Sequence, residues 1–208
     1  MKKAKHLVIL NKNIKPQKSE AFLIAIMDEL IDIVTETGKA TGKVAPKSEI
    51  HSKGYYHNTA HLWLYTKTGE ILLAQRSYKK AICPGMWDVS VAGHVDAGES
   101  IEAAVLRETK EELSLTLSEK QLTKIGVFPC FQSYNSGITD NEFHHTFLAE
   151  LTVPVDNLTP QPEEVEAFKL VSIAQFKKLL TNSENNEYFV PSNRAYYLEV
   201  LKNITESL

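Results

Sequence analysis

Residues 93–115, GHVDAGESIEAAVLRETKEELSL, constrain the fold more than any other stretch of the chain. The second half predicts a helix over 100–113, because its apolar residues share one face and a serine can cap its first turn. Glu108, Glu111 and Glu112 crowd this helix, since they fall within an arc of roughly 100°. Like charges at this spacing are mildly destabilising, which indicates that another group neutralises them.

Carboxylates on one helical face form a hard-oxygen site of the kind that Mg²⁺ or Mn²⁺ prefers. Such a metal usually completes its shell with water and substrate phosphate, so it can clamp a diphosphate and activate a water. Arg107 stands beside the cluster and can pair with Glu99, which would hold the preceding loop against the helix. The alternative interpretation is a solvated acidic face, which is common because glutamate is a good helix former.

Composition fits one ordinary globular domain and excludes several partners. A chain of 208 residues, 43% hydrophobic and 24% charged, can bury a single core. The net charge of −3 gives no basic footprint for a nucleic-acid polymer, and no apolar run is long enough to span a membrane. The start of the chain lacks a signal-peptide pattern, and Cys83 and Cys130 show no metal spacing. We therefore expect a cytoplasmic protein with reduced thiols.

The remaining patterns alternate strands with few helices, which favours an α/β sandwich over a helical bundle. Residues 1–28 are expected to be an N-terminal extension and 29–208 the domain, which begins with a hairpin-like pattern that turns at Thr37-Gly38. We expect strands at 61–65, 71–76 and 87–92, and in KIGVFPCFQSY, EFHHTFLAEL and EAFKLVS. Further helices are expected in IAQFKKLL and PSNRAYYLEVLKNI.

The loop and helix together resemble the signature of the Nudix hydrolase family. The positions that match are Gly93, Glu99, Arg107, Glu108, Glu111 and Glu112. Two positions depart from the signature, because Thr109 stands where an aliphatic residue is usual and Ser114 stands where glycine is usual. The second position favours a left-handed backbone. Both departures concern the packing and exit of the helix rather than the chemistry.

The resemblance implies a Nudix-type α/β/α sandwich with a mixed sheet, and a Mg²⁺- or Mn²⁺-dependent hydrolase. Such an enzyme cleaves a phosphoanhydride bond in a small nucleoside or isoprenoid diphosphate metabolite. It implies Glu108 and Glu112 as metal ligands, with Glu111 in support and the Gly93 carbonyl as an addition. Either Glu108 or a residue outside the motif, such as Glu142, would deprotonate the attacking water. The catalytic residues implied are Glu99, Arg107, Glu108 and Glu142, and a homodimer is left open because many relatives are dimers.

Residues 28 to 182 resemble more narrowly the branch that contains isopentenyl-diphosphate isomerase and its hydrolase relatives. In the isomerase, three histidines and two acidic residues hold a metal. The residues at or near those positions here are His57, His94, Asp140 and Glu142, with His51 one residue out of register. Whether they form a second metal site, suited to Mn²⁺ or Zn²⁺, stays open at this point.

The isomerase also uses a cysteine, and Ala92 occupies the corresponding position before Gly93-His94. Alanine cannot donate a proton, and the hydrolase motif is complete, so the pattern favours hydrolysis. An isopentenyl-diphosphate isomerase is the first alternative. A non-catalytic metabolite-sensing module is the second, although such modules typically lose motif carboxylates.

Substrate contacts are expected from residues outside the motif. Arg76 at a strand end can neutralise a substrate phosphate, and His94 is a further candidate for substrate binding. His144 and His145 alternate along a predicted strand, so at most one faces the site. For each of these two histidines, a surface or packing role is favoured over ligation.

Overall fold

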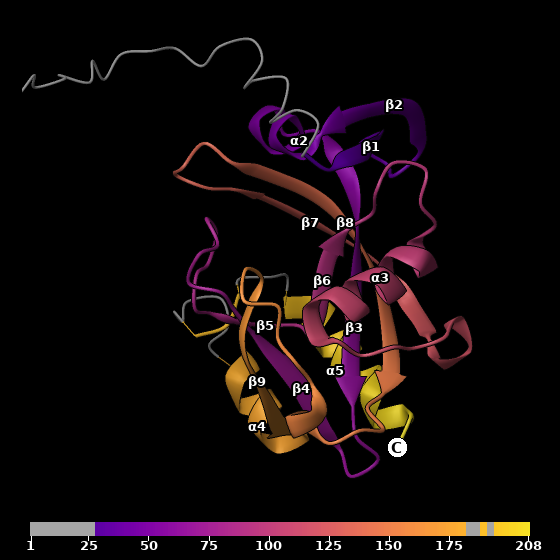
Figure 1. Cartoon of the computed structure of the whole chain (residues 1–208), viewed down its shortest axis with the longest axis vertical. Helices are drawn as coiled ribbons and strands as arrows, with labels where there is room; N and C mark the ends of the chain where they lie inside the picture. The colour runs from indigo at the N-terminus through magenta and orange to yellow at the C-terminus, as the bar shows by residue number, and fades with distance from the viewer. Residues whose placement is uncertain (1–27, 182–187, 191–193) are drawn as a thin grey trace, which may run out of the picture.

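The computed structural model describes residues 28–181, 188–190 and 194–208 (Figure 1). The predicted extension therefore lies outside the described residues, apart from Asp28. A two-stranded sheet opens the described chain, formed by β1 (Leu30–Val34) and β2 (Ala40–Pro46). The turn between them contains Gly38 with a φ of 74°, as the sequence predicts. This hairpin packs on the motif loop, where Asp32 accepts a hydrogen bond from the Gly98 amide at 2.8 Å.

A mixed seven-stranded sheet forms the body of the molecule, with the order β5-β4-β3-β8-β7. Strand β6 also pairs with β3, and β9 pairs with β4. Strands β3 and β8 are parallel, whereas the other pairs are antiparallel. The strands are β3 (Tyr56–Tyr65), β4 (Glu70–Arg76), β5 (Trp87–Asp88), β6 (Val91–His94), β7 (Thr123–Ser133), β8 (Thr139–Glu150) and β9 (Val165–Ser172).

Strands β3 and β4 are paired only at Tyr65 and Ile71 and then diverge into a fork. Ser90 holds this fork, because its hydroxyl donates to the Leu72 carbonyl at 2.7 Å and accepts from the Leu64 amide at 2.8 Å. Here the prediction of one strand over 87–92 is wrong. The segment is split into β5, which pairs with β4, and β6, which pairs with β3, because it crosses from one arm of the fork to the other.

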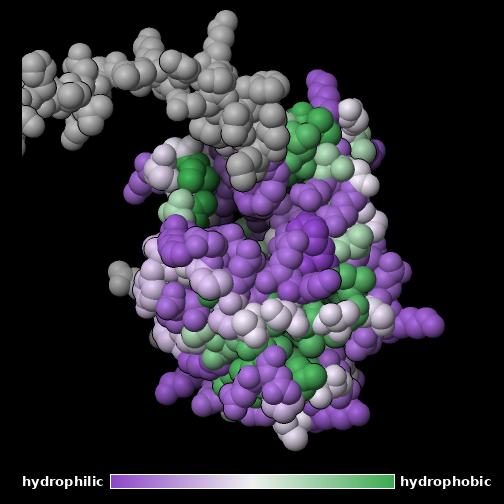
Figure 2. Space-filling view, in the orientation of Figure 1, coloured by the Kyte–Doolittle hydropathy of each residue, from purple (hydrophilic) through white to green (hydrophobic). Residues whose placement is uncertain are grey.

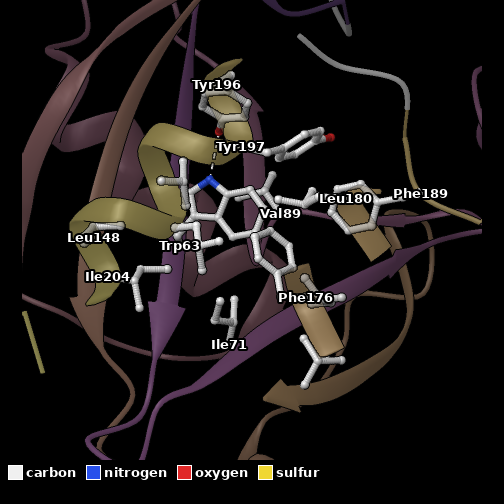
Figure 3. Close-up of a cluster of buried hydrophobic side chains, with 14 residues drawn as sticks. Trp63, Ile71, Val89, Leu148, Phe176, Leu180, Phe189, Tyr196, Tyr197 and Ile204 are labelled. Carbon is white, nitrogen blue, oxygen red and sulfur yellow. Dashed lines mark hydrogen bonds between the residues drawn. The ribbon is translucent and has the colours of Figure 1, made fainter. Parts of the chain in front are cut away.

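Helices cover both faces of the sheet (Figure 1). Successive residues of β3 alternate between the two layers: Leu62 and Leu64 pack in the cluster that contains α3 side chains, whereas Trp63 packs against α4 and α5. Figure 3 shows the Trp63 indole among Phe176 and Tyr197 of those helices. The helices are α2 (Lys47–Lys53), α3 (Ile101–Leu113), α4 (Ile173–Leu180) and α5 (Arg194–Glu206), with short 3₁₀ segments at Glu119–Gln121 and Val155–Asn157.

The predicted α/β/α sandwich with a mixed sheet is confirmed. Helix α3 has the predicted bounds, and Ser100 caps it by accepting a hydrogen bond from the Ala103 amide at 3.2 Å. Ser114 adopts the left-handed conformation with a φ of 56°, and the buried Thr109 hydroxyl donates to the Val105 carbonyl at 2.6 Å. Helix α2 was not predicted. None of the helices in the described ranges has both the length and the apolar character that a bilayer crossing requires.

Candidate metal and diphosphate site

A cavity of about 550 Å³ lies at the fork of β3 and β4. Its volume falls within the roughly 300–1,000 Å³ typical of small-molecule sites. Hydrophilic side chains dominate the face of the molecule that carries α3 (Figure 2). The fork brings most of the predicted site residues together, since the cavity is lined by Arg76, Gly93, His94, Arg107, Glu108, Glu111, Glu112 and Glu142. Glu99 is not among the described residues that line it.

The carboxylates of α3 differ in exposure. Glu112 is 6% exposed, whereas the side chain of Glu111 is 49% exposed. Burial raises the pKa of Glu112 well above its usual value, and the Glu108 and Glu164 carboxylates raise it further. Burial also raises the pKa of Glu108 to about 7, although Arg107 opposes this shift. A divalent cation at this cluster would supply positive charge that favours the ionised carboxylates.

Arg107 ties the motif loop to α3, as its spacing from Glu99 predicts. Its guanidinium donates to both oxygens of Glu99, at 3.1 and 2.9 Å, and to the His94 carbonyl at 3.0 Å. It also donates to Glu108 at 2.7 Å and Glu111 at 3.2 Å. The planar guanidinium of arginine suits the bidentate contact with Glu99. Glu99 thus orients Arg107, and Arg107 in turn orients two of the carboxylates.

A second cluster is formed by three histidines from separate elements: His51 of α2, His57 of β3 and His94 of β6. One nitrogen from each lies within 4.8 Å of the others. The Nδ1 atom of His57 lies 3.0 Å from the Tyr55 carbonyl, so it carries the proton and leaves a lone pair on Nε2. That Nε2 atom and the Nε2 of His94 are buried without a hydrogen-bond partner among the described residues. Buried polar atoms are rarely left unpaired, and a metal ion would satisfy both.

Two carboxylates of β8 complete this histidine cluster. Asp140 Oδ1 lies 2.8 Å from His51 Nδ1, and Glu142 Oε1 lies 3.6 Å from His57 Nε2. Burial lowers the pKa of His94 well below its usual value, which favours the neutral imidazole that metals bind. The donor set therefore fits a transition-metal ion such as Mn²⁺ or Zn²⁺. His94 lies within this cluster and also lines the cavity.

Sequence reasoning missed one residue of the cavity and misjudged another. His61 lies four residues after His57 in β3, and therefore on the same face of the strand, a signal that could have identified it. It stacks on His144, with ring centroids 3.9 Å apart. His144 lines the cavity and lies 2.8 Å from Glu142, whereas His145 bonds to Asn58 instead. The alternation along β8 is as predicted, since His144 lines the cavity and His145 does not.

Glu142 lies between two histidines. His144 Nε2 is 2.8 Å from its Oε2 atom, while Oε1 faces His57. Burial alone would raise the pKa of Glu142, but the hydrogen bond with His144 and the proximity of His57 lower it well below its usual value. Glu142 thus lines the cavity and is largely buried.

Basic residues line the opposite arm of the fork. Arg76 donates to Asp88 at 3.1 Å and to the Ile82 carbonyl at 3.1 Å, which fixes it in the cavity wall. Lys80 also lines the cavity and is paired with Glu164. The acidic helix and these cations face one shared space, an arrangement that can hold metal ions and phosphate together.

Comparisons with known proteins agree with this geometry. Residues 55–192 match the family model for the NUDIX domain. The chain is 36% identical over 168 residues to Nudix hydrolase 3 of Arabidopsis thaliana, a match that covers 79% of this chain but 22% of that protein. It is 31% identical over 202 residues to an uncharacterized Nudix hydrolase of Clostridium acetobutylicum, covering 84% and 96% of the two chains. An isopentenyl-diphosphate Delta-isomerase of Streptomyces coelicolor is 32% identical over 165 residues, covering 77% and 78%.

Solved structures show the same fold at lower identity. A Deinococcus radiodurans protein aligns with a TM-score of 0.59 and 17% identity, covering 86% of this chain and 98% of that one. A MutT protein of Methanosarcina mazei aligns with a TM-score of 0.54 and 18% identity, covering 73% and 94%. Both likenesses concern the fold alone.

Proposed function

The chain belongs to the NUDIX domain family, and we propose that it is a metal-dependent hydrolase that cleaves a phosphoanhydride bond in a small diphosphate-containing metabolite. One observation carries the proposal. The complete carboxylate set of α3 faces a cavity in which Ala92, rather than a thiol, adjoins Gly93. Relatives named as hydrolases and relatives named as isomerases both resemble the chain, so the residues of the cavity decide between the two activities.

Glu108, Glu111 and Glu112, with the Gly93 carbonyl, would hold Mg²⁺ or Mn²⁺. A cation bound there supplies a Lewis acid and a water of lowered pKa. The residues of the chain then position the substrate: Arg76 neutralises phosphate charge from the opposite arm of the fork. We assign proton abstraction to Glu108, because Glu142 is held by two histidines.

The histidine cluster is proposed as a second metal site, with Mn²⁺ or Zn²⁺ as its occupant. Its proposed ligands are His51, His57, His94, Asp140 and Glu142. The unpaired imidazole nitrogens support this assignment, since a buried lone pair without a donor is the state that a metal ligand requires. We further propose that residues 29–208 act as one domain.

The test is product release from a panel of nucleoside diphosphates, nucleotide sugars, dinucleotides and isoprenoid diphosphates, with Mg²⁺ or Mn²⁺ and an EDTA control. Metal-dependent release of phosphate or a monophosphate product supports the hydrolase. Deuterium incorporation into isopentenyl diphosphate without phosphate release would support the isomerase instead. Tight metabolite binding without turnover would indicate a sensing module.

A further inference from the structure

Two stacked histidines in the cavity wall have not been assigned a contact with substrate: His61, and His144, which also holds Glu142. The rings of His61 and His144 are nearly parallel, at 22°, with centroids 3.9 Å apart. The two residues are 7% and 5% exposed, and both line the cavity. Their hydrogen bonds show what kind of group the pair can receive.

The tautomer of His61 follows from the residues behind it. The Trp63 indole donates to the Tyr196 hydroxyl oxygen at 2.8 Å, a contact drawn in Figure 3. The Tyr196 hydroxyl, which is also hydrogen-bonded with the Thr146 side chain, lies 2.9 Å from His61 Nδ1, and we assign its hydrogen to that nitrogen. With Nδ1 accepting, the ring proton of His61 is on Nε2. His61 thus offers an N–H donor that no side chain of the described chain is seen to use.

Of the two ring nitrogens of His144, one is paired with a carboxylate and the other is not. Its Nε2–H donates to Glu142 Oε2 at 2.8 Å. Its Nδ1 is buried and has no nitrogen or oxygen partner among the described residues. The ring is also hydrogen-bonded with the Cys130 thiol, which is only a weak hydrogen-bonding group. Since buried polar atoms are normally satisfied, this nitrogen indicates a missing ligand atom.

A hydroxyl group satisfies this pair. It accepts from the N–H of His61, and it can either donate to or accept from His144 Nδ1, whichever proton that ring carries. A hydrocarbon chain would leave both nitrogens unpaired. We propose that His61 and His144 bind a hydroxyl on the organic part of the substrate. On the premise of the proposed hydrolase function, the substrate class is then diphosphates of hydroxylated alcohols or sugars, rather than plain prenyl diphosphates.

The position of the pair suits such a substrate. His61 is the register partner of Ala92 in the adjacent strand β6, and adjacent strands lie about 4.8 Å apart. The backbone amide of Ala92 in turn donates to the Glu112 carboxylate. The hydroxyl subsite and the carboxylate cluster therefore flank the same short segment. A diphosphate at the cluster would place a nearby carbon of its ester group beside the histidines.

The decisive comparison uses two ligands that differ by one hydroxyl. Methylenebisphosphonate esters of 3-methylbutanol and of 3-hydroxy-3-methylbutanol resist hydrolysis, so calorimetry in Mg²⁺ measures their binding without turnover. We expect the hydroxylated ester to bind about tenfold more tightly, the effect of roughly one satisfied buried hydrogen bond. Equal affinities, or no binding of the hydroxylated ester, would overturn the proposal.

Two variants locate the preference. His144→Phe keeps an aromatic ring for stacking and removes both nitrogens, so it should reduce the tenfold ratio to about one. His145→Phe is the matched control, because His145 is the next residue of β8 and points away from His144; it should keep the ratio. Damage to the metal sites would weaken the binding of both esters alike. The ratio of the two affinities therefore reports on the hydroxyl subsite alone. A ratio that survives His144→Phe would overturn the assignment.

This outcome is separable from that of the proposed function. Metal-dependent hydrolysis of prenyl and hydroxylated diphosphates at equal rates, with equal binding, would preserve the hydrolase and remove the subsite. A retained hydroxyl preference in binding, with no turnover of any diphosphate, would preserve the subsite and remove the hydrolase.

Discussion

A Cβ atom added to Gly93 would lie 2.0 Å from the carboxyl carbon of Glu108. The strand and the acidic helix are therefore packed so closely that glycine is required, and the carboxylate rests directly on the backbone of β6. This contact holds Glu108 in place before any ligand binds. It also places the Gly93 carbonyl close enough to be considered with the carboxylates as a metal ligand.

Gly93→Ala should accordingly reduce kcat by at least a hundredfold, because the methyl group must displace Glu108. Steady-state kinetics on the best substrate of the panel would measure the loss. Gly42→Ala provides a control substitution, since an added Cβ there meets no atom within 4 Å, although its φ of 70° makes the backbone mildly strained. Near-normal turnover in Gly93→Ala would contradict the close packing.

Glu112→Gln should abolish turnover while retaining the fold, since the amide keeps the shape of the side chain but cannot bind a divalent cation as a carboxylate does. In the metal-free protein the same change should raise the melting temperature at neutral pH, because the folded state no longer has to bury a charge or take up a proton to avoid one. Thermal melts in EDTA would show the gain. A lower melting temperature would mean that the charge is already compensated within the chain.

The stability of the metal-free protein should fall as pH rises from about 6.5 to 8, whereas below that range the lowered pKa values of His61, His94 and His145 act in the opposite direction. Glu108 has a folded-state pKa of about 7, above its unfolded value, so its contribution is fully present below the unfolded pKa and is lost as pH rises through 7. Glu112, whose pKa is also raised, acts in the same direction. Melting curves between pH 5 and 8, with EDTA or Mn²⁺, would test this. Mn²⁺ should restore stability most at the alkaline end.

His57→Asn should remove one bound transition metal per chain. The histidine supplies an unpaired Nε2, and no nearby side chain can replace it in the same position. Metal analysis after dialysis should therefore find one equivalent less Mn²⁺ or Zn²⁺ than in the wild type. His145→Asn, on the opposite face of β8, should leave the metal content unchanged. Equal metal content in both variants would exclude the histidine cluster as a site.

Glu99→Gln should lower kcat by roughly ten- to a hundredfold with a small effect on KM, the range seen when a residue that orients a metal ligand is changed. Glu99 touches Arg107 through two hydrogen bonds and does not line the cavity among the described residues. The substitution should act indirectly, because a less well oriented Arg107 no longer holds the Glu108 and Glu111 carboxylates in place. A dominant rise in KM would instead indicate direct substrate contact.

The carboxylate cluster could be predicted because it depends on local order. Glu108, Glu111 and Glu112 belong to one helix, and the helical repeat alone brings them together. The left-handed backbone at Ser114 was likewise predicted from its place after that helix. Because the helical repeat fixes the relative positions of residues in a contiguous motif, this part of the site could be predicted from the sequence.

The histidines depend on contacts that no local pattern encodes. His51 lies on a helix of seven residues with Ile50 as its one buried residue, too short to give a periodic signal. His144 reaches His61 through the parallel pairing of β8 with β3, which joins segments more than eighty residues apart. The split of 87–92 at Ser90 is hidden for a similar reason, since each half pairs with a different distant strand.

The fork held by Ser90 separates two tasks that proteins often combine. In the proposed function, one arm and α3 would carry out the phosphate chemistry, while the inward positions of β3 and β8 would contact the rest of the ligand. Substitutions at His61 or His144 would change which compound is accepted without altering the residues that cleave it. Descendants of such a chain could therefore acquire new substrates by exchanging a few strand residues, with the catalytic apparatus inherited unchanged.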